Sequence, residues 1–282
     1  MKVELIVDAR AVLGEGPTWD AKTQTLYWLD IVSKRLYSGK TVLAEFDAYP
    51  GCLAPCRDGN LIVGTRFDIL SFDPVARRST VLASLSEEPE GNRVNDGKCD
   101  PAGRFLLGTM DMVNEREPTG ALYSFDGAVH PLLGGQIISN GITWSPDGKT
   151  LYHIDTPTRL VKAYRYDVES GLLAHPRVHI SVPAELGWPD GMTSDQEGNL
   201  WIAMWGGAQI TKWSPSGRLL EQVPVPALNV TSCVFGGEDR NELYITSARK
   251  GMNESELAGY PYSGGLFRMV TKTTGMETFQ FG

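Results

Sequence analysis

One short pattern recurs six times along this chain: a polar turn, a hydrophobic run of strand length and a polar stop. The six segments read DAKTQTLYWLDI (20–31), RDGNLIVGTR (57–66), PAGRFLLGTM (101–110), SPDGKTLYHIDT (145–156), DQEGNLWIAMW (195–205) and EDRNELYITSA (238–248). Asp-Gly, Ala-Gly and Glu-Gly pairs in the turns are typical of β-hairpins. The Leu, Ile, Tyr and Trp residues that follow them favour half-buried strands. The repeat therefore predicts a fold built from six similar units of antiparallel strands.

Each repeated strand has a shorter strand-like run on either side, such as GPTW before the first and RLYSG after it. Each unit thus supplies three strands, and the segment that leads to the next unit can supply a fourth. The units are about forty to fifty residues apart, as in propeller blades. A sandwich of two sheets is the alternative, but six units fill the chain. We therefore expect an all-β fold, a six-bladed β-propeller with four-stranded antiparallel blades, as one domain over residues 1–282.

The first strand-like run, residues 3–7, has no place in the inner hairpin of the first unit. We expect it to pair with the last blade and close the ring, which would remove an exposed sheet edge. The nearest approach to a helix, residues 253–257, is too short to change the fold class.

Composition bears on compartment and partners. The N-terminus lacks the apolar run of a signal peptide, and no stretch approaches the ~20 apolar residues of a membrane span. We expect a cytoplasmic protein whose four cysteines are buried and reduced. A net charge of −8 argues against nucleic acid and anionic membranes as partners. We expect a small-molecule ligand and a monomer or weak homo-oligomer.

A polar residue recurs at one place in four of the six units. Glu15, Asn140 and Asp190 each precede a glycine, and Asn95 lies one residue further from its own. All four stand ten or eleven residues before the first apolar residue of the repeated strand. In a propeller, the innermost strand of each blade lines the central channel, so these side chains should converge on the axis. Units two and six offer only Pro50-Gly51 and Ser232-Cys233 there, which leaves the ring asymmetric.

Two carboxylates and two amides at one point are typical of a metal site. Their oxygens suit hard cations such as Ca²⁺, Mg²⁺ or Mn²⁺ better than zinc, which usually recruits His or Cys. No histidine recurs at this offset, and His153 lies within a strand, as a core residue would. Asn-Gly and Asp-Gly are also common turn dipeptides. The matching offsets in four units favour the site over that alternative.

Several motifs together resemble the SMP-30/gluconolactonase/luciferin-regenerating (regucalcin-like) family. They are LGEGPTW (13–19), RVNDGKCDPAGRFLLGTM (93–110), SNGITWSPDGKTLYHIDT (139–156), PDGM (189–192) and TSCVFGGEDRNELYITSAR (231–249). The resemblance implies a six-bladed enzyme that hydrolyses sugar lactones to aldonic acids with one divalent metal, for which Zn²⁺ or Fe²⁺ are also possible. It implies that Glu15, Asn140 and Asp190 are metal ligands and that Arg93 and Asn95 bind substrate.

The chain departs from the family pattern at one place. Some members have an acidic pair after the Gly-Thr-Met run that touches the sugar, whereas this chain has Asp111-Met112-Val113. We expect Asp111 to substitute as a substrate contact, with Glu115 close by. This departure leaves the choice of sugar open between lactones of the gluconolactone and pentonolactone types.

The hypothesis for the mechanism has the metal polarise the lactone carbonyl while water attacks it. Asp190 is the expected general base, and a metal-bound hydroxide is the competing nucleophile. Trp188 and Trp205 either stack on the sugar ring or pack between blades. Two other functions remain open: a calcium-binding regulatory propeller without turnover, and a metal-dependent hydrolase of another ester such as an organophosphate.

Overall fold

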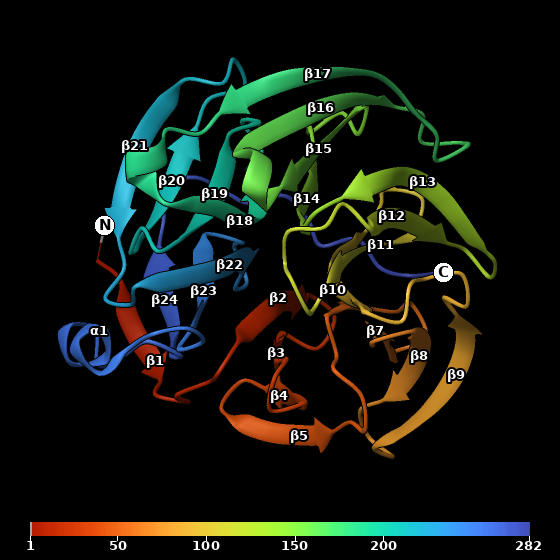
Figure 1. Ribbon diagram of the computed structural model, residues 1–282, viewed down its shortest axis with the longest axis horizontal. Helices are drawn as coiled ribbons and strands as arrows, with labels where there is room; N and C mark the ends of the chain where they lie inside the picture. Colours follow the sequence, from red (N-terminus) through yellow and green to blue (C-terminus); the bar gives the residue numbers. More distant parts are fainter. Residues whose placement is uncertain (1) are drawn as a thin grey trace.

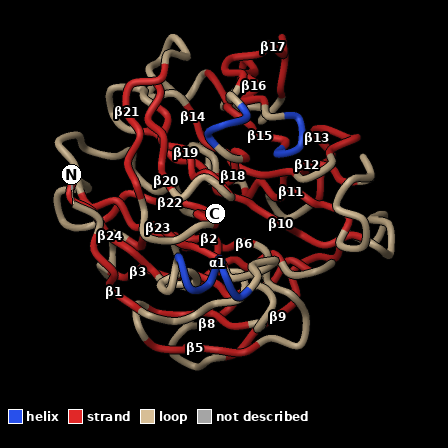
Figure 2. Tube along the Cα trace, turned by 60° about the vertical axis from the view of Figure 1, so that its left-hand side comes forward, coloured by secondary structure: helices blue, strands red, loops and turns tan. Residues whose placement is uncertain are grey.

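The computed structural model describes residues 2–282, which form six four-stranded antiparallel sheets arranged in a ring (Figure 1). This confirms the predicted six-bladed β-propeller. In five blades the strands follow one another as a meander, and the first strand of each is innermost. Figure 2 shows that almost all of the regular structure is strand.

The first three blades contain β2 (Gly14–Asp20), β3 (Thr25–Asp30), β4 (Arg35–Ser38) and β5 (Thr41–Glu45); β6 (Cys52–Pro55), β7 (Leu61–Gly64), β8 (Asp68–Asp73) and β9 (Arg78–Ser84); and β10 (Asn92–Cys99), β11 (Phe105–Asp111), β12 (Gly120–Phe125) and β13 (Val129–Gln136). Blades four and five contain β14 (Ser139–Trp144), β15 (Thr150–Asp155), β16 (Leu160–Tyr166) and β17 (Leu173–Ser181); and β18 (Trp188–Ser194), β19 (Leu200–Trp205), β20 (Gln209–Trp213) and β21 (Leu219–Pro224). Blade six contains β22 (Asn229–Gly236), β23 (Glu242–Ala248), β24 (Leu266–Val270) and β1 (Glu4–Val7).

The hydrophobic core lies between the faces of neighbouring blades. The repeated strands predicted from the sequence are β3, β7, β11, β15, β19 and β23, and nearly all of their residues are buried. The outermost strands β9, β13 and β17 are mostly exposed or half-buried. This gradient follows from the packing, because a middle strand is covered on both faces whereas an outer strand is not.

The ring closes as the sequence predicts. β1 pairs antiparallel with β24, with Glu4 opposite Arg268 and Leu5 opposite Phe267. Glu4 and Arg268 also form an ion pair at 3.7 Å. The last blade is therefore built from both ends of the chain, and the pairing covers one edge of β24.

Helical structure is limited to short pieces. α1 (Glu254–Gly259) begins at Asn253, whose side chain accepts a hydrogen bond from the Glu256 amide in a capping box. Two short 3₁₀ helices are η1 (Thr156–Thr158) and η2 (Ala184–Leu186). Among residues 2–282 there is no helix of the length and apolarity that would carry the chain across a membrane.

The C-terminal segment crosses one face of the ring. The Met276 amide donates to Ser194 O at 3.1 Å, the Phe281 amide to Pro55 O at 2.9 Å, and the Gly282 amide to Gly103 O at 3.0 Å. These contacts lie at the far ends of inner strands or in the hairpin turns that follow, so the segment runs from blade six past blade five to blades two and three. It covers the end of the channel opposite to the starts of the inner strands.

The four cysteines, Cys52, Cys56, Cys99 and Cys233, are buried and unpaired, as expected for reduced core side chains. Burial raises the pKa of the Cys56 and Cys233 thiols to about 12. They therefore pack as small apolar groups.

Candidate functional site

The four recurring polar residues lie near the starts of four inner strands, where the strand register is interrupted. In blade one the pairing shifts between Glu15 and Thr18, and in blade four between Asn140 and Ile142. The same interruption precedes Gly97 and Met192 in blades three and five. A β-bulge re-aims the side chain beside it. The bulges therefore explain why these side chains leave the sheet pattern and face the channel.

The pairing of the strands identifies the residues of blades two and six that are equivalent to Glu15, Asn95, Asn140 and Asp190. We call these six equivalent places, one in each blade, the ring positions. In the four polar blades, the ring residue lies four positions before the partner of the first apolar residue in the repeated strand. The same count gives Gly51 in blade two and Thr231 in blade six, not Pro50 and Ser232. The offset of ten or eleven residues already allows Gly51 in blade two, whereas the longer hairpin turn of blade six moves the position there by one residue. Thr231 donates its hydroxyl proton to Gly14 O at 2.6 Å, so the ring stays asymmetric.

The ring forms the floor of a pocket of about 610 Å³ at one end of the channel. This volume is in the range of small-molecule sites. Its lining residues are Leu13, Glu15, Arg93, Asn95, Met110, Glu115, Arg116, Ile138, Asn140, Thr156, Pro157, Trp188, Asp190, Trp205, Lys250 and Gly251. Five of the six residues predicted for the site thus share one pocket, and Asp111 is the exception.

The two carboxylates in the floor are buried and close enough to influence each other. Burial raises the pKa of Glu15 well above its ordinary value, and the negative charges of Asp190 and Asp96 raise it further. Burial and the charge of Asp96 likewise raise the pKa of Asp190, while the neighbouring Asn140 side chain, the Gly191 amide and the charge of Arg93 lower it. The cluster therefore favours a cation or a proton between its members.

One carboxylate oxygen of Asp190 is unsatisfied by the protein. This Oδ1 atom is buried and has no hydrogen-bond partner anywhere in residues 2–282. A buried carboxylate oxygen without a partner is costly. A bound cation or a water molecule would satisfy this oxygen atom.

The two amides present their oxygens to the pocket, because their nitrogens are held elsewhere. Asn140 Nδ2 donates to Thr156 Oγ1 at 3.1 Å, and Asn95 Nδ2 donates to Ser139 O at 3.0 Å. Thr156 in turn donates to Pro189 O at 2.8 Å, which ties blade four to blade five beside Asp190. Both amide oxygens remain free to face a cation or a hydroxyl group.

These donors fit a hard divalent cation. Glu15 and Asp190 supply two negative charges, and Asn140 supplies a neutral oxygen, which is the ligand chemistry that Ca²⁺, Mg²⁺ and Mn²⁺ prefer. In the part of the chain that the structure describes, no three His, Cys, Asp or Glu side chains gather in a metal-binding group. A metal site formed by Glu15 and Asp190 therefore needs the amide oxygen of Asn140 as its third protein ligand.

Arg93 lies in the pocket as a buried cation. Its Nη1 atom donates to Val94 O at 2.9 Å, which fixes the guanidinium group. Burial lowers the pKa of Arg93, whereas the charges of Glu15, Glu115 and Asp190 raise it. The remaining guanidinium N–H groups can donate to a ligand's hydroxyl or carbonyl oxygens.

Asp111 does not reach the pocket, contrary to the expectation from sequence. Its Oδ1 atom accepts from the Val113 amide at 2.8 Å, and its Oδ2 atom from the Asn114 amide at 3.3 Å. The carboxylate thus stabilises its own turn. Glu115, four residues later, lines the pocket in its place and pairs with Lys250 of the segment after β23.

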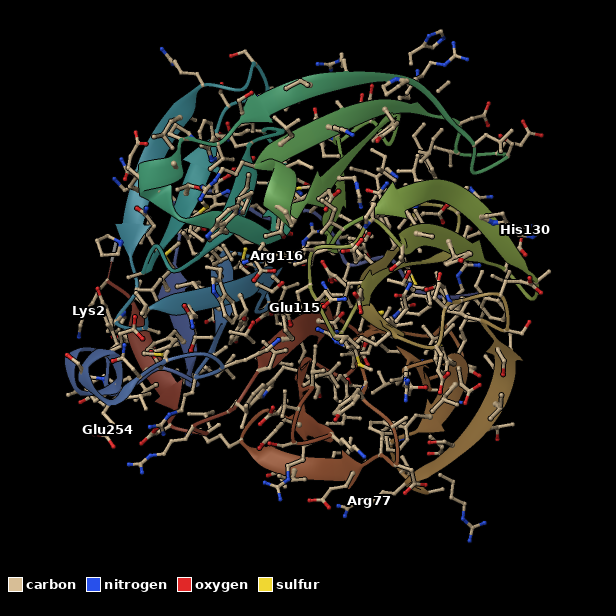
Figure 3. The ribbon with its side chains drawn as sticks, in the orientation of Figure 1. Lys2, Arg77, Glu115, Arg116, His130 and Glu254 are labelled. Atoms are coloured by element: carbon tan, nitrogen blue, oxygen red, sulfur yellow. The ribbon has the colours of Figure 1, made fainter. Side chains whose placement is uncertain are left out.

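The loop after β11 lies over the mouth of the pocket. Figure 3 labels Glu115 and Arg116 near the centre of the ring, and both line the pocket. Neither Arg116 nor Lys250 stands in a repeated motif, and loops of two different blades bring them together. Sequence reasoning missed both residues, and Thr156 as well, although Thr156 directly follows the repeated strand of blade four.

The two tryptophans differ in their surroundings. Trp188 is 41% exposed, and the Arg159 guanidinium carbon lies 3.6 Å from its ring centroid. Trp205 is half-buried against the apolar cluster between blades one and two. Both line the pocket. Trp205 therefore packs between blades, as one of the two alternatives has it, and stacking of either ring on a sugar stays a prediction.

His153 is a core residue, as expected. It is buried, and Ser139 Oγ lies 2.8 Å from its Nε2 atom. Burial lowers the pKa of His153 to about 3, so the ring is neutral at physiological pH.

Fold and site define the class of this protein: a six-bladed propeller with a pocket at one end of its axis, whose floor holds two buried carboxylates and two amides. A sequence model of the SMP-30/Gluconolactonase/LRE-like region matches residues 13–249, and the chain belongs to this family.

Similar proteins cover nearly the whole chain. Regucalcin of Danio rerio is 36% identical over 281 residues, which cover 96% of this chain and 94% of the relative. A Bacillus subtilis protein with the provisional name sugar lactone lactonase YvrE is 34% identical over 299 residues, covering 100% of this chain and 99% of the relative. The crystal structure of a calcium-binding protein, regucalcin from Agrobacterium tumefaciens, superimposes with a TM-score of 0.94 at 28% identity, covering 99% and 96% of the two chains.

Proposed function

We propose that this protein is a metal-dependent sugar lactonase that hydrolyses an aldonolactone of the gluconolactone or pentonolactone type to its aldonic acid. The observation that carries the proposal is the unpartnered Oδ1 atom of Asp190, buried beside Glu15 in the floor of the pocket. The name of the Bacillus subtilis relative supports lactone hydrolysis. The similarity to a calcium-binding protein of Agrobacterium tumefaciens supports a divalent cation.

Glu15, Asn140 and Asp190 would hold the divalent cation. When bound, such an ion supplies a Lewis acid that polarises a carbonyl group. A hard cation such as Ca²⁺, Mg²⁺ or Mn²⁺ suits these oxygen donors best, and Zn²⁺ or Fe²⁺ are the less favoured choices.

The protein's own residues position the lactone and move a proton. Arg93 donates hydrogen bonds to substrate oxygens, and Asn95 accepts from a hydroxyl through its free amide oxygen. Asp190 takes a proton from the attacking water as a C–O bond forms at the carbonyl carbon. The bond from that carbon to the ring oxygen then breaks, and Asp190 returns the proton to the leaving oxygen. The product is the open-chain aldonic acid.

The ligand we propose is a small molecule, without nucleic acid or membrane as partner, and the protein acts in the cytoplasm as a monomer or weak homo-oligomer. The net charge of −8 supports a small-molecule ligand over nucleic acid or an anionic membrane. Sedimentation in solution tests the assembly state. The polar groups of the pocket floor are buried and the pocket has a volume of about 610 Å³, which suits a compact substrate better than a polymer.

A panel of aldono-1,4- and 1,5-lactones in a weakly buffered pH-indicator assay tests the activity. We expect acid release that stops on chelation and returns with added Mn²⁺ or Ca²⁺. Asp190→Ala should remove turnover while its melting curve stays cooperative. Absence of metal-dependent acid release from every lactone would refute the proposal.

The second candidate is a calcium-binding propeller without turnover, which the regucalcin relatives favour by name. It predicts calcium binding in calorimetry together with an inactive lactone panel. A phosphotriester assay run in parallel tests a third candidate, a metal-dependent hydrolase of another ester, in the same pocket.

A further inference from the structure

The proposed metal ligands of blades four and five are neighbours whose main chains are in close contact. Gly141 follows Asn140, and a Cβ atom at Gly141 would lie 2.6 Å from Asp190 O. Glycine is therefore required for β14 and β18 to approach each other beside the pocket. This packing sets the separation of the two backbones. It does not decide which end of the Asn140 amide faces the pocket, because the oxygen and nitrogen ends are nearly the same in shape.

The hydroxyl group of Thr156 decides that orientation. Thr156 directly follows β15, is half-buried and lines the pocket. Its Oγ1 atom lies 2.8 Å from Pro189 O and 3.1 Å from Asn140 Nδ2. A carbonyl oxygen only accepts hydrogen bonds, so the single hydroxyl proton goes to Pro189 and Thr156 accepts from Asn140. The amide must therefore present its NH₂ group to Thr156, which leaves its Oδ1 atom for a ligand in the pocket.

The turn that carries Thr156 is itself tied to the start of β14. The Thr156 amide donates to Ile138 O at 3.2 Å. The preceding residue, Asp155, accepts from the Ile138 amide at 2.9 Å and from the Ile137 amide at 3.3 Å. Main-chain contacts therefore hold the hydroxyl group beside Asn140, and none of these contacts requires a bound ion.

We propose that Thr156 is a positioning residue of the metal site: its hydroxyl group turns the Asn140 amide so that the oxygen, and not the nitrogen, faces the cation. The same group ties this ligand to the main chain of Pro189, next to Asp190. The inference rests on the proposed function, because it assumes that Asn140 and Asp190 hold a divalent ion together with Glu15. Thr156 acts through Asn140 and not on the reacting atoms.

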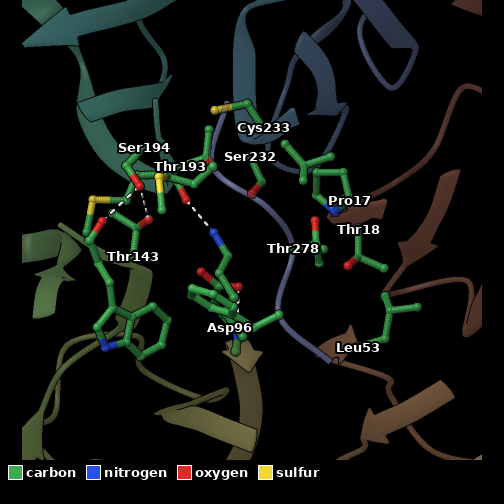
Figure 4. Close-up of a pocket in the computed structure, with 18 of the residues that line it drawn as sticks. Pro17, Thr18, Leu53, Asp96, Thr143, Thr193, Ser194, Ser232, Cys233 and Thr278 are labelled. Atoms are coloured by element: carbon green, nitrogen blue, oxygen red, sulfur yellow. Dashed lines mark hydrogen bonds between the residues drawn. The ribbon is translucent and has the colours of Figure 1, made fainter. Parts of the chain in front are cut away.

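A second hydroxyl tie joins the same two blades and supplies a control. Thr143 Oγ1 lies 2.9 Å from Ser194 Oγ, which donates in turn to Trp144 O at 2.9 Å. Both hydroxyl residues line a smaller cavity of about 40 Å³, further along the inner strands from the pocket (Figure 4). In residues 2–282 neither hydroxyl group bonds to a proposed metal ligand. Loss of this tie therefore tests whether any contact between blades four and five affects the ion.

Calorimetry with Mn²⁺ and with Ca²⁺ on the full chain, without substrate, tests the proposal. Thr156→Val keeps the shape and removes the hydroxyl group, so affinity should fall about tenfold or more, as is usual when a residue that orients a ligand is lost. Thr156→Ala removes the same group with less bulk and should behave alike. Thr156→Ser keeps the hydroxyl group, and Thr143→Val leaves Asn140 untouched. Both should stay within about threefold of wild type, below the range for a lost orienting contact.

Three results would overturn the inference. They are wild-type affinity in Thr156→Val and Thr156→Ala, a loss in Thr156→Ser equal to that in Thr156→Val, and an equal loss in Thr143→Val. Melting curves in chelator check that each variant is folded, and saturating metal should restore most of the kcat of Thr156→Val. If the wild-type protein binds no divalent ion, the proposed function itself fails, which is a different result from unequal binding among the variants.

Discussion

The buried carboxylates of Glu15 and Asp190 in the floor of the pocket should destabilise the metal-free protein. We predict that Asp190→Asn raises the melting temperature in the presence of a chelator, although it removes a metal ligand. The reason is that Asp190 is 5% exposed, its Oδ1 atom lacks a partner in the described chain, and Glu15 and Asp96 repel its charge. Asparagine keeps the shape and has no charge to bury.

The direction of the effect follows from the pKa change and depends on pH. The pKa of Asp190 is raised by folding, so its contribution to stability is complete below the unfolded pKa, about 4, and is lost as pH rises toward the folded value. Each unit of upward shift costs about 1.4 kcal/mol once the carboxyl is ionised. An unsatisfied buried polar group costs about 1–3 kcal/mol, and a gain of about 2 kcal/mol for Asp190→Asn at pH 8 corresponds to roughly 4–8 °C in a domain near this size.

Thermal melts between pH 5 and pH 8.5, with chelator and with added Mn²⁺ or Ca²⁺, measure this effect. The wild-type protein should lose stability as pH rises in chelator, and the metal should restore it. Asp190→Asn should show a flatter pH profile and little response to metal. A variant that melts below wild type in chelator at pH 8, or keeps the same pH slope, would refute the reasoning.

Asp195→Asn is the matched control, since it removes another buried aspartate from blade five. Asp195 differs from Asp190 because its oxygens accept from the side chains of Asn199 and Trp201, at 2.9–3.0 Å, and Lys212 lies 3.4 Å away. Loss of this satisfied charge leaves Lys212 without its partner. Asp195→Asn should therefore lower the melting temperature with and without metal, by about 3 kcal/mol or more in stability.

Three further predictions concern the rest of the molecule. Lys250→Met breaks the exposed ion pair with Glu115; it should cost no more than about 1 kcal/mol in chemical denaturation, while KM for the lactone changes because both residues line the mouth. His153 should keep a neutral ring in NMR spectra down to about pH 4, because burial lowers its pKa to about 3; protonation near pH 6 would contradict its burial. Phe281→Ala should destabilise the protein by about 1–3 kcal/mol in urea, since this ring stacks on Phe125 at 5.6 Å and anchors the C-terminal segment; an unchanged midpoint would show that the segment is not anchored there.

The fold was predictable from the sequence because each blade repeats the same pattern, a buried hydrophobic strand between polar turns. LIVG of β7 and FLLG of β11 read as buried strands between polar turns, and they are buried on both faces. The pairing of residues 3–7 with the last blade followed from the lack of any other partner in blade one, and the structure has β1 beside β24.

The site was predictable only where it obeys the repeat. Glu15, Asn140 and Asp190 each precede a glycine and stand ten or eleven residues before a repeated strand, and the structure brings them to one pocket. The position in blade six was misplaced by one residue, because a sequence offset counts turn residues whereas the place in the channel is fixed by strand pairing.

The rim of the pocket follows no repeat. Asp111 was expected at the substrate because it follows β11's Gly-Thr-Met run, yet it serves its own turn through the Val113 amide. Glu115 and Lys250 are 135 positions apart in the chain and meet only through the ring. Contacts of this kind depend on tertiary geometry, so local sequence carries no signal for them.

The pairing of β1 with β24 has a consequence for synthesis. Glu4 leaves the ribosome long before its partner Arg268 is made. At about 5–20 residues per second, the first strand waits on the order of tens of seconds for its neighbour. Blade six and the closed ring can form only then, so the strand made first is set in place last. A translational pause within the codons for β23 and β24 would prolong the time in which that edge is open to other chains.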